Sequence, residues 1–222
     1  MWNLLFPKSC LICENPLCKG EEGVCRYCLG HLPRTNFHLE KDNPAEQLFF
    51  GKCEIQQAAS FCYFEKGNDL RRLIHEFKYR NNRDVAVQLG ALYGRELMRS
   101  DWSDGIDLIV PVPLHYYKKI KRGYNQSEYI ARGLSSALCK PLCNSVLRKE
   151  RNAATQTRKT LYDRYLNADR SFSLHNGAKL SGKHLLLVDD VLTSGATLEA
   201  CANTLLAIPD VKISIITLAF AE

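Results

Sequence analysis

The sequence has no hydrophobic run long enough to cross a bilayer, and it contains no internal repeat and no low-complexity segment. Its start, MWNLLFPKSC, also lacks the charged leader and the long apolar run of a signal peptide. We therefore expect a cytoplasmic protein with no membrane insertion. Its 222 residues, of which 45% are hydrophobic and 24% are charged, suit one sizeable globular domain with a small appendage.

Disulfide bonds are not expected among the ten cysteines, because thiols in the cytoplasm stay reduced. Cys10 with Cys13, and Cys25 with Cys28, form two Cys-x-x-Cys pairs near the start of the chain. Two such pairs can complete a tetrahedron of thiolates, the usual closed site of structural zinc. The polar segment between them has too few apolar residues to fold alone, so zinc would stabilise it. Cys18 is a spare thiol that could replace one ligand, and a set of disulfides is the alternative interpretation.

Acidic residues are scarce in the middle third of the chain. Between Lys118 and Arg164 there are 12 Lys and Arg residues against three acids, whereas the whole chain carries a net charge of +6. This concentration suits a ligand that bears pyrophosphate or a nucleic-acid backbone, and an ordinary basic surface loop is the alternative. Tyrosines among the cations either stack single-stranded bases or line the edge of the core. The candidate nucleic-acid contacts are Lys118, Lys119, Lys121 and Arg122.

The clearest chemical signal is the stretch LLLVDDVLTSGAT, residues 185–197. Its first four residues predict a strand buried on both faces, and the small residues that follow lead into a helix near Thr197. Gly195 lets the backbone approach a ligand, and the first amides of a helix, with nearby hydroxyls, can cradle a phosphate. Asp189 and Asp190 would repel a bare phosphate, so they suit hydroxyl groups or a divalent cation. Together these groups describe a ribose 5-phosphate, and a buried strand with a solvated turn is the alternative.

A second loop follows another short apolar run, at 106–110, and contains Pro111, Val112 and Pro113. The prolines stiffen this loop and remove two amide donors. The cations behind it fit a second anion site, this time for a pyrophosphate. An ordinary basic surface loop is again the alternative.

Helical periodicity is clearest just before Lys78, which either suits the dipole at the helix end or contacts a ligand. The predicted buried face of this helix is Leu70, Leu73, Ile74 and Phe77. Further helices are expected at 85–98, from an N-cap pair of Asn125 and Glu128 to about 138, and after 197. Strands are expected at 58–64, 106–110, 144–148, near 172, at 185–188 and at 211–220. This alternation predicts an α/β fold, a mostly parallel sheet with helices on both faces.

The order of the motifs closely resembles that of the ComF-type competence proteins, relatives of the amidophosphoribosyltransferases, over nearly the full length. After the cysteine pairs come FKYRN, IVPVPLHYYKKIKRGYNQSEYIA, RNAATQTRKTLYDRYLN and LLLVDDVLTSGATL. The last stretch looks like the phosphoribosyl-pyrophosphate (PRPP) signature of the type I phosphoribosyltransferases. The resemblance implies a type I phosphoribosyltransferase-like domain at 53–222, after a zinc-binding N-terminal segment and connector at 1–52. Two details depart from the family pattern: Cys18 is extra, and Ala153 stands where a hydroxyl residue is common.

The resemblance also implies a role for each motif at a site for PRPP and magnesium. The aspartates would contact the ribose hydroxyls. The loop that contains Pro111 and Pro113, called the proline loop below, would lie on the pyrophosphate side, and 149–165 would be a flexible catalytic loop. The implied catalytic residues are Asp189, Asp190, Arg151 and Arg158. The implied PRPP-binding residues are Val191, Leu192, Thr193, Ser194, Gly195, Ala196, Thr197, Pro111, Val112, Pro113 and Lys78.

Two functions follow as hypotheses. In the first, the protein binds PRPP or ribose 5-phosphate and acts in natural competence, where it handles incoming single-stranded DNA in the cytoplasm. Competence DNA-translocase and DNA-processing proteins would then be its partners. In the second, it is an active magnesium-dependent phosphoribosyltransferase with an unknown base or amine acceptor and no DNA role. The sequence shows no acceptor-reading segment with identifiable chemistry beyond the short cysteine region.

Overall fold

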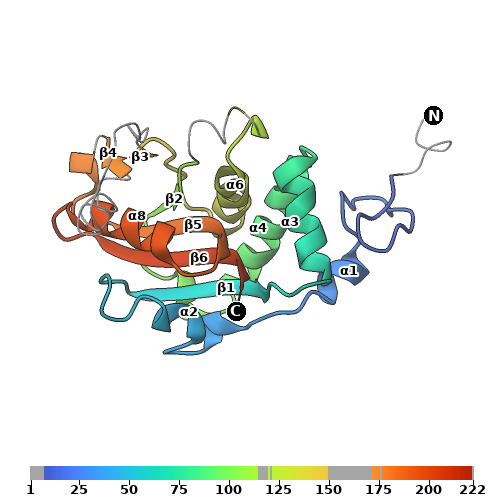
Figure 1. Cartoon of the computed structure of the whole chain (residues 1–222), viewed down its shortest axis with the longest axis horizontal. Helices are drawn as coiled ribbons and strands as arrows, with labels where there is room; N and C mark the ends of the chain where they lie inside the picture. The colour runs from blue at the N-terminus through green and yellow to red at the C-terminus, as the bar shows by residue number, and fades with distance from the viewer. Residues whose placement is uncertain (1–7, 115–119, 121, 150–171, 176, 222) are drawn as a thin grey trace, which may run out of the picture.

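The computed structural model describes residues 8–114, 120, 122–149, 172–175 and 177–221. Its centre is a four-stranded sheet in the order β1-β6-β5-β2, in which all neighbouring strands are parallel (Figure 1). The strands are β1 (Gln57–Tyr63), β6 (Lys212–Phe220), β5 (His184–Leu192) and β2 (Leu108–Pro111). Parallel strands bring their carboxyl ends to one edge, so the residues that follow β2 and β5 meet there. The predicted mostly parallel α/β sheet is confirmed.

Helices of two or more turns accompany the sheet: α3 (Asp69–Tyr79), α4 (Arg83–Leu97), α6 (Gln126–Leu138) and α8 (Ala196–Leu206). Helix α6 packs on β2 and β5, α8 packs on β5 and β6, and α4 packs on α6. A separate sheet pairs β3 (Leu147–Lys149) antiparallel with β4 (Phe172–Leu174). The shorter helical segments are α1 (Arg26–Gly30), η2 (Phe37–Leu39), α2 (Pro44–Gln47), η3 (Asp101–Ser103) and η4 (Gly177–Leu180).

The sheet is covered on both faces. Successive side chains of a strand point to opposite faces, and every residue of β6 from Ile213 to Phe220 is buried. In β5 the apolar run from Leu185 to Val188 is also fully buried, as its unbroken hydrophobic sequence predicts. Burial of these residues removes apolar surface from water on either side of the sheet, which is the main force that holds the layers together.

Helices α4 and α6 approach each other closely because glycines stand at their contact. A Cβ atom on Gly133 would lie 2.1 Å from the carbonyl oxygen of Val87, and one on Gly90 would lie 2.2 Å from that of Ile130. A side chain at either position would push the helices apart, since protein interiors are close-packed. This contact fixes the position of α6, whose Ser127 reaches strand β5.

Strand β5 is longer than the sequence predicts. It continues through Asp189 and Asp190 to Leu192, because β6 supplies parallel partners as far as Phe220. The two aspartates therefore lie inside the strand rather than in the loop after it. Helix α3, by contrast, buries the predicted face, which is Leu70, Leu73, Ile74 and Phe77.

The beginning of α6 differs from the predicted N-cap pair. Asn125 does stand at the N-cap position, but its side chain makes no capping hydrogen bond. Its Nδ2 donates instead to the carbonyl oxygen of Val112 at 2.9 Å. Glu128 accepts a hydrogen bond from Arg132 at 2.7 Å. The tertiary contact with the proline loop orients this side chain, and its Oδ1, the atom that would cap the helix, is buried without a hydrogen-bond partner among the described residues.

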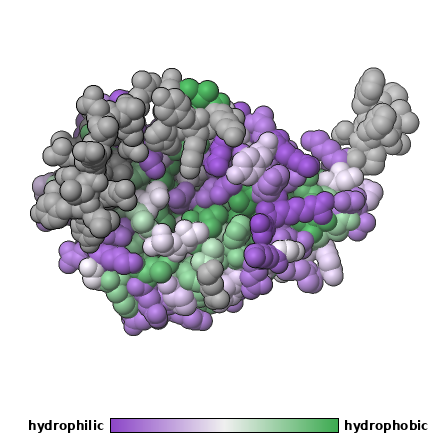
Figure 2. All heavy atoms as spheres, viewed as in Figure 1, coloured by the Kyte–Doolittle hydropathy of each residue, from purple (hydrophilic) through white to green (hydrophobic). Residues whose placement is uncertain are grey.

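The N-terminal segment contacts α3 and α4, and Figure 2 shows hydrophilic side chains gathered over this side of the molecule. Arg72 of α3 donates to the carbonyl oxygen of Ile12 at 3.0 Å and pairs with Glu14 at 2.9 Å. Gln88 of α4 donates to the carbonyl oxygen of Val24 at 3.2 Å. The division of the chain at residue 52 stays a prediction. Within the described ranges, no helix is both long and apolar enough to span a membrane.

Candidate functional site

The candidate site lies where β5 gives way to α8, at the carboxyl edge of the sheet. Gly195 has a φ of 76° in the left-handed region and caps α8 without a side-chain hydrogen bond. The first amides of the helix are thus left for a ligand. A cavity of about 60 Å³ lies here and is lined by Asp189 and residues 191–198. One ordered water needs roughly 10–15 Å³, so the cavity has room for a phosphoryl group.

Strand β5 places Asp189 in the lining of this cavity, and Asp190 is the next residue of the strand. Oδ1 of Asp189 accepts hydrogen bonds from Oγ of Ser127 and from the backbone amide of Asp190, each at 2.8 Å. Burial, followed by repulsion from the Asp190 carboxylate, raises the pKa of Asp189 to about 7. The Asp189 carboxyl therefore titrates near neutral pH.

Lys78 reaches the same pair from the last turn of α3. Its Nζ lies 2.8 Å from Oδ2 of Asp190, and the two side chains are only 18% and 15% exposed. The sequence left open whether this lysine serves the helix dipole or a ligand. The structure places its ammonium against an aspartate of the candidate site, so an incoming ligand meets an existing ion pair there.

The proline loop lies next to β5, as parallel pairing of β2 with β5 requires. Pro111 is the register partner of Val188, and the amide of Val112 donates to the carbonyl oxygen of Val188 at 2.8 Å. Pro111 and Val112 are buried, while Pro113 is half-buried. A cavity of about 390 Å³ opens beside the loop. Its lining includes Pro111, Pro113, Asn125, Glu128, Arg148 and Lys149.

Cys10, Cys13, Cys25 and Cys28 come together in the N-terminal segment, with all four sulfur atoms within 4.8 Å of one another. Sγ of Cys10 accepts hydrogen bonds from the amides of Ile12 and Cys25, both at 3.4 Å. Burial raises the pKa of the Cys10 thiol, but hydrogen bonds from the amides of Cys25, Cys13 and Ile12 and from the Cys13 side chain together outweigh it, so the pKa is lowered to about 6. Four convergent sulfurs, one of them favouring the thiolate, could hold a metal ion. Cys18 is exposed and lies outside the cluster.

Several predicted residues lie outside the described residues, namely Lys118, Lys119, Lys121, Arg151 and Arg158. Arg122 is described, and its guanidinium donates to Oε1 of Gln126 at 3.2 Å and lies 5.3 Å from the ring centroid of Tyr79. Tyr124 is only 5% exposed, with the Arg83 guanidinium 4.6 Å from its ring centroid. For this tyrosine the interpretation as an edge of the core holds.

Sequence reasoning missed two contacts of the aspartate pair. Ser127 comes 62 residues before Asp189, and nothing in the sequence near it points to a carboxylate. The ion pair of Lys78 with Asp190 likewise joins distant segments. The register of β2 beside β5, with α6 packed across both, creates the first contact, and the docking of α3 creates the second.

Comparison with known proteins identifies the family of this chain. The family model described as "Phosphoribosyl transferase domain" matches residues 104–222. A relative from Escherichia coli K12, named "DNA utilization protein YhgH", is 31% identical over 220 residues, which cover 91% of this chain and 92% of the relative. "Competence protein F" from Haemophilus influenzae is 27% identical over 90% of this chain and 91% of its own.

A third relative, "Competence protein ComFC" from Bacillus subtilis, is 24% identical over 89% of this chain and 88% of its own. A solved glutamine PRPP amidotransferase from B. subtilis aligns with 64% of this chain and 30% of that one, at 20% identity and a TM-score of 0.44. The domain match spans more than half of the chain, and the curated relatives match nearly all of it. The chain therefore belongs to the phosphoribosyl transferase domain family and, within it, to the ComF-type competence proteins.

Proposed function

We propose that this protein binds PRPP or ribose 5-phosphate, together with Mg²⁺, and acts in natural competence on incoming single-stranded DNA in the cytoplasm. The observation that carries the proposal is the phosphate-sized cavity at the start of α8, which Asp189 lines and which Asp190 adjoins in the sequence of β5. A positive helix end and an acidic pair side by side suit a ligand with a phosphate at one end and hydroxyls beside it. The names of the relatives support the role in competence and DNA utilization.

In this proposal each part of the site takes one part of the ligand. The amides and hydroxyls of Thr193–Thr197 hold the 5-phosphate, and Asp189 and Asp190 accept hydrogen bonds from the ribose hydroxyls. The loop at 111–113 faces the pyrophosphate. Arg151 and Arg158 would close over the ligand. Bound Mg²⁺ would neutralise charge on the pyrophosphate leaving group.

Turnover is the alternative function, and one observation favours it. The cavity of about 390 Å³ beside Pro113 adjoins the proposed pyrophosphate side and is lined by Glu128, Arg148 and Lys149. It lies within the range of about 300–1,000 Å³ typical of small-molecule sites, so a base or an amine would fit there. The protein would then be a transferase with no need for DNA.

The remaining motifs serve structure and nucleic acid in this proposal. Zinc would occupy the cluster of Cys10, Cys13, Cys25 and Cys28 and stabilise the segment 1–52, while 53–222 would carry the ligand. The DNA contacts would be Lys118, Lys119, Lys121 and Arg122. DNA-translocase and DNA-processing proteins of competence would be the partners.

Calorimetric titration of the protein with PRPP, in buffer that contains MgCl₂, tests the central claim. Asp190→Asn should weaken binding by about tenfold or more, because it removes a charged acceptor of the ribose hydroxyls. Asp104→Asn is the matched control, since Asp104 is exposed and lies outside the cavity. Equal affinity of Asp190→Asn and the parent protein would reject the assigned role.

Two further measurements separate the functions. Pyrophosphate release from PRPP, without and with bases and amines, would identify turnover. Binding of a single-stranded oligonucleotide at several salt concentrations would identify the DNA role, and replacing Lys121 and Arg122 by Gln should flatten its salt dependence. A salt slope equal to that of the parent protein would exclude this surface.

A further inference from the structure

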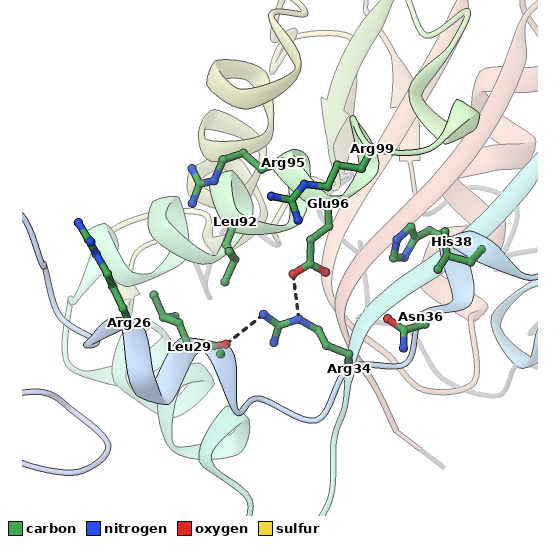
Figure 3. A pocket seen from close by; sticks show the side chains of 11 residues that line it. Arg26, Leu29, Arg34, Asn36, His38, Leu92, Arg95, Glu96 and Arg99 are labelled. Atoms are coloured by element: carbon green, nitrogen blue, oxygen red, sulfur yellow. Dashed lines mark hydrogen bonds and ion pairs between the residues drawn. The ribbon is translucent and has the colours of Figure 1, made fainter.

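A second cavity, of about 770 Å³, lies away from the carboxyl edge of the sheet, between α1, η2 and α4 (Figure 3). It shares no lining residue with the cavity beside Asp189. Its charged lining consists of Arg26, Arg34, Arg95, Arg99 and Glu96. Four guanidinium groups against one carboxylate give the cavity a strongly positive wall.

The single carboxylate is already neutralised within this wall. Nε of Arg34 lies 3.1 Å from Oε1 of Glu96, and Nη2 of Arg34 donates to the carbonyl oxygen of Leu29 at 3.0 Å. The Arg34 guanidinium also lies 4.1 Å from the ring centroid of Phe61. Arg34 is thus a fixed part of the structure, and its ion pair with Glu96 leaves no other carboxylate in the cavity lining for the remaining three arginines.

Those three arginines line the cavity from separate parts of the chain. Arg26 belongs to α1, Arg95 to α4, and Arg99 follows α4, and Figure 3 shows their side chains around one hollow above Arg34. All three are exposed, and none forms an ion pair with another residue in the described part of the chain. Glu21, which accepts a hydrogen bond from the backbone amide of Arg26 at 2.8 Å, offsets part of the charge of Arg26. The wall as a whole stays positive, and because like charges repel, it favours an external anion.

The helix dipole does not account for this arrangement. Cations are favoured at the end of a helix, which would suit Arg95 and Arg99. Arg26, however, is the first residue of α1, where the dipole disfavours a positive charge. One anionic ligand would account for the positions of Arg26, Arg95 and Arg99, whereas the helix dipole accounts only for those of Arg95 and Arg99.

The chemistry of the wall indicates the class of ligand. Guanidinium groups present paired N–H donors that match phosphate oxygens. The volume falls within the roughly 300–1,000 Å³ of small-molecule sites and is far larger than a lone phosphate needs. Leu29, Leu39 and Leu92 add an apolar side, which suits a flat ring better than water. We propose that this cavity binds a phosphate ester of nucleotide type, at a site separate from the PRPP site proposed above.

Titration with ADP and ATP in buffer without magnesium tests the proposal, with a 5′-phosphorylated oligothymidylate in a parallel titration. Saturable binding is expected, and it should be at least about tenfold weaker in the double variant Arg95→Gln/Arg99→Gln, which loses two phosphate-binding forks. Asp190→Asn should bind these ligands as the parent protein does, because Asp190 does not line this cavity. Thermal unfolding should be unchanged, since both arginines are exposed.

The matched control is Lys179→Gln/Lys212→Gln, which removes the same charge from two exposed positions outside the cavity. If the protein binds the oligonucleotide but neither ADP nor ATP, and the arginine variant weakens that binding, the site is supported and its ligand is the phosphorylated end of a DNA strand. The proposal would be overturned by absence of binding to every probe, by full affinity in the arginine variant, or by an equal loss in the lysine control.

Discussion

Nζ of Lys78 lies 2.8 Å from Oδ2 of Asp190, which joins the last turn of α3 to the end of β5. The same helix contacts the N-terminal segment through Arg72, whose guanidinium binds Ile12 and Glu14. Helix α3 thus touches both the cysteine segment and the candidate site. Among the described residues, Lys78 is the only lysine that forms an ion pair with Asp189 or Asp190. The orientation of α3 therefore determines where this ion pair forms.

Removal of the Lys78 side-chain charge should destabilise the protein. Lys78→Met leaves the Asp190 carboxylate largely buried and without its ion-pair partner, beside a second carboxyl group. We expect the free energy of unfolding to fall by roughly 1–3 kcal/mol in urea denaturation, as for other lost hydrogen bonds to charged groups.

A double-mutant cycle separates this pair from unrelated effects of the substitution. In Asp190→Asn the cost of Lys78→Met should be smaller, because the unpaired charge is gone. Lys78→Arg keeps the charge and should retain most of the stability. Additive effects of the two substitutions would show that the ion pair contributes nothing.

The raised pKa of Asp189 predicts a pH dependence of stability. In the folded state this carboxyl titrates at about 7, whereas it titrates near 3.9 when unfolded. Between these values the folded state binds more protons, so the free energy of unfolding falls as the pH rises, by up to about 1.4 kcal/mol per pH unit. The groups that interact with Asp189 are Ser127 Oγ, the amide and carboxylate of Asp190, Lys78, and the buried Cys201 thiol of α8.

Urea unfolding between roughly pH 5 and roughly pH 8 checks this sign. Asp189→Asn lacks the titration, so the stability of the parent protein relative to this variant should fall through neutral pH and then level off. A constant difference between the two proteins would show that the carboxyl titrates normally.

Loss of one cluster thiol should release metal. Cys25→Ser removes one of four sulfurs that lie within 4.8 Å of one another, and incomplete coordination weakens a structural site strongly. Elemental analysis should find zinc in the parent protein and little in this variant, with a lower unfolding temperature. Cys18→Ser is the control, because Cys18 is exposed and outside the cluster. Equal zinc in both variants would contradict the proposed ligand set.

A methyl group at the contact of α4 with α6 should be costly. The Cβ of Gly133→Ala would lie 2.1 Å from the carbonyl oxygen of Val87, so the helices must separate. We expect a loss of roughly 1–3 kcal/mol in the free energy of unfolding, as in other overpacked cores. Ligand affinity should fall too, since α6 carries Ser127. Gly30→Ala adds the same methyl where no atom lies within 4 Å and should be nearly neutral.

Much of the fold could be predicted from local patterns. The buried face of α3 follows from the spacing of Leu70, Leu73, Ile74 and Phe77. The central strand follows from its unbroken apolar run, and the two Cys-x-x-Cys pairs predict the cluster that the structure assembles. Element ends were less accurate: β5 extends to Leu192 because β6 continues to pair with it.

By itself, the sequence determined the order of strands and helices, the four cysteines, and the acidic pair before a small-residue loop, because each is encoded within a few neighbouring residues. Only the tertiary structure decided that Lys78 and Ser127 bind this pair and that Asn125 holds the proline loop rather than its own helix. It also decided that arginines from α1 and α4 line one cavity. These contacts join residues far apart in the chain, and they exist only after the parallel sheet and the glycine contact between α4 and α6 have fixed the register and orientation of the elements.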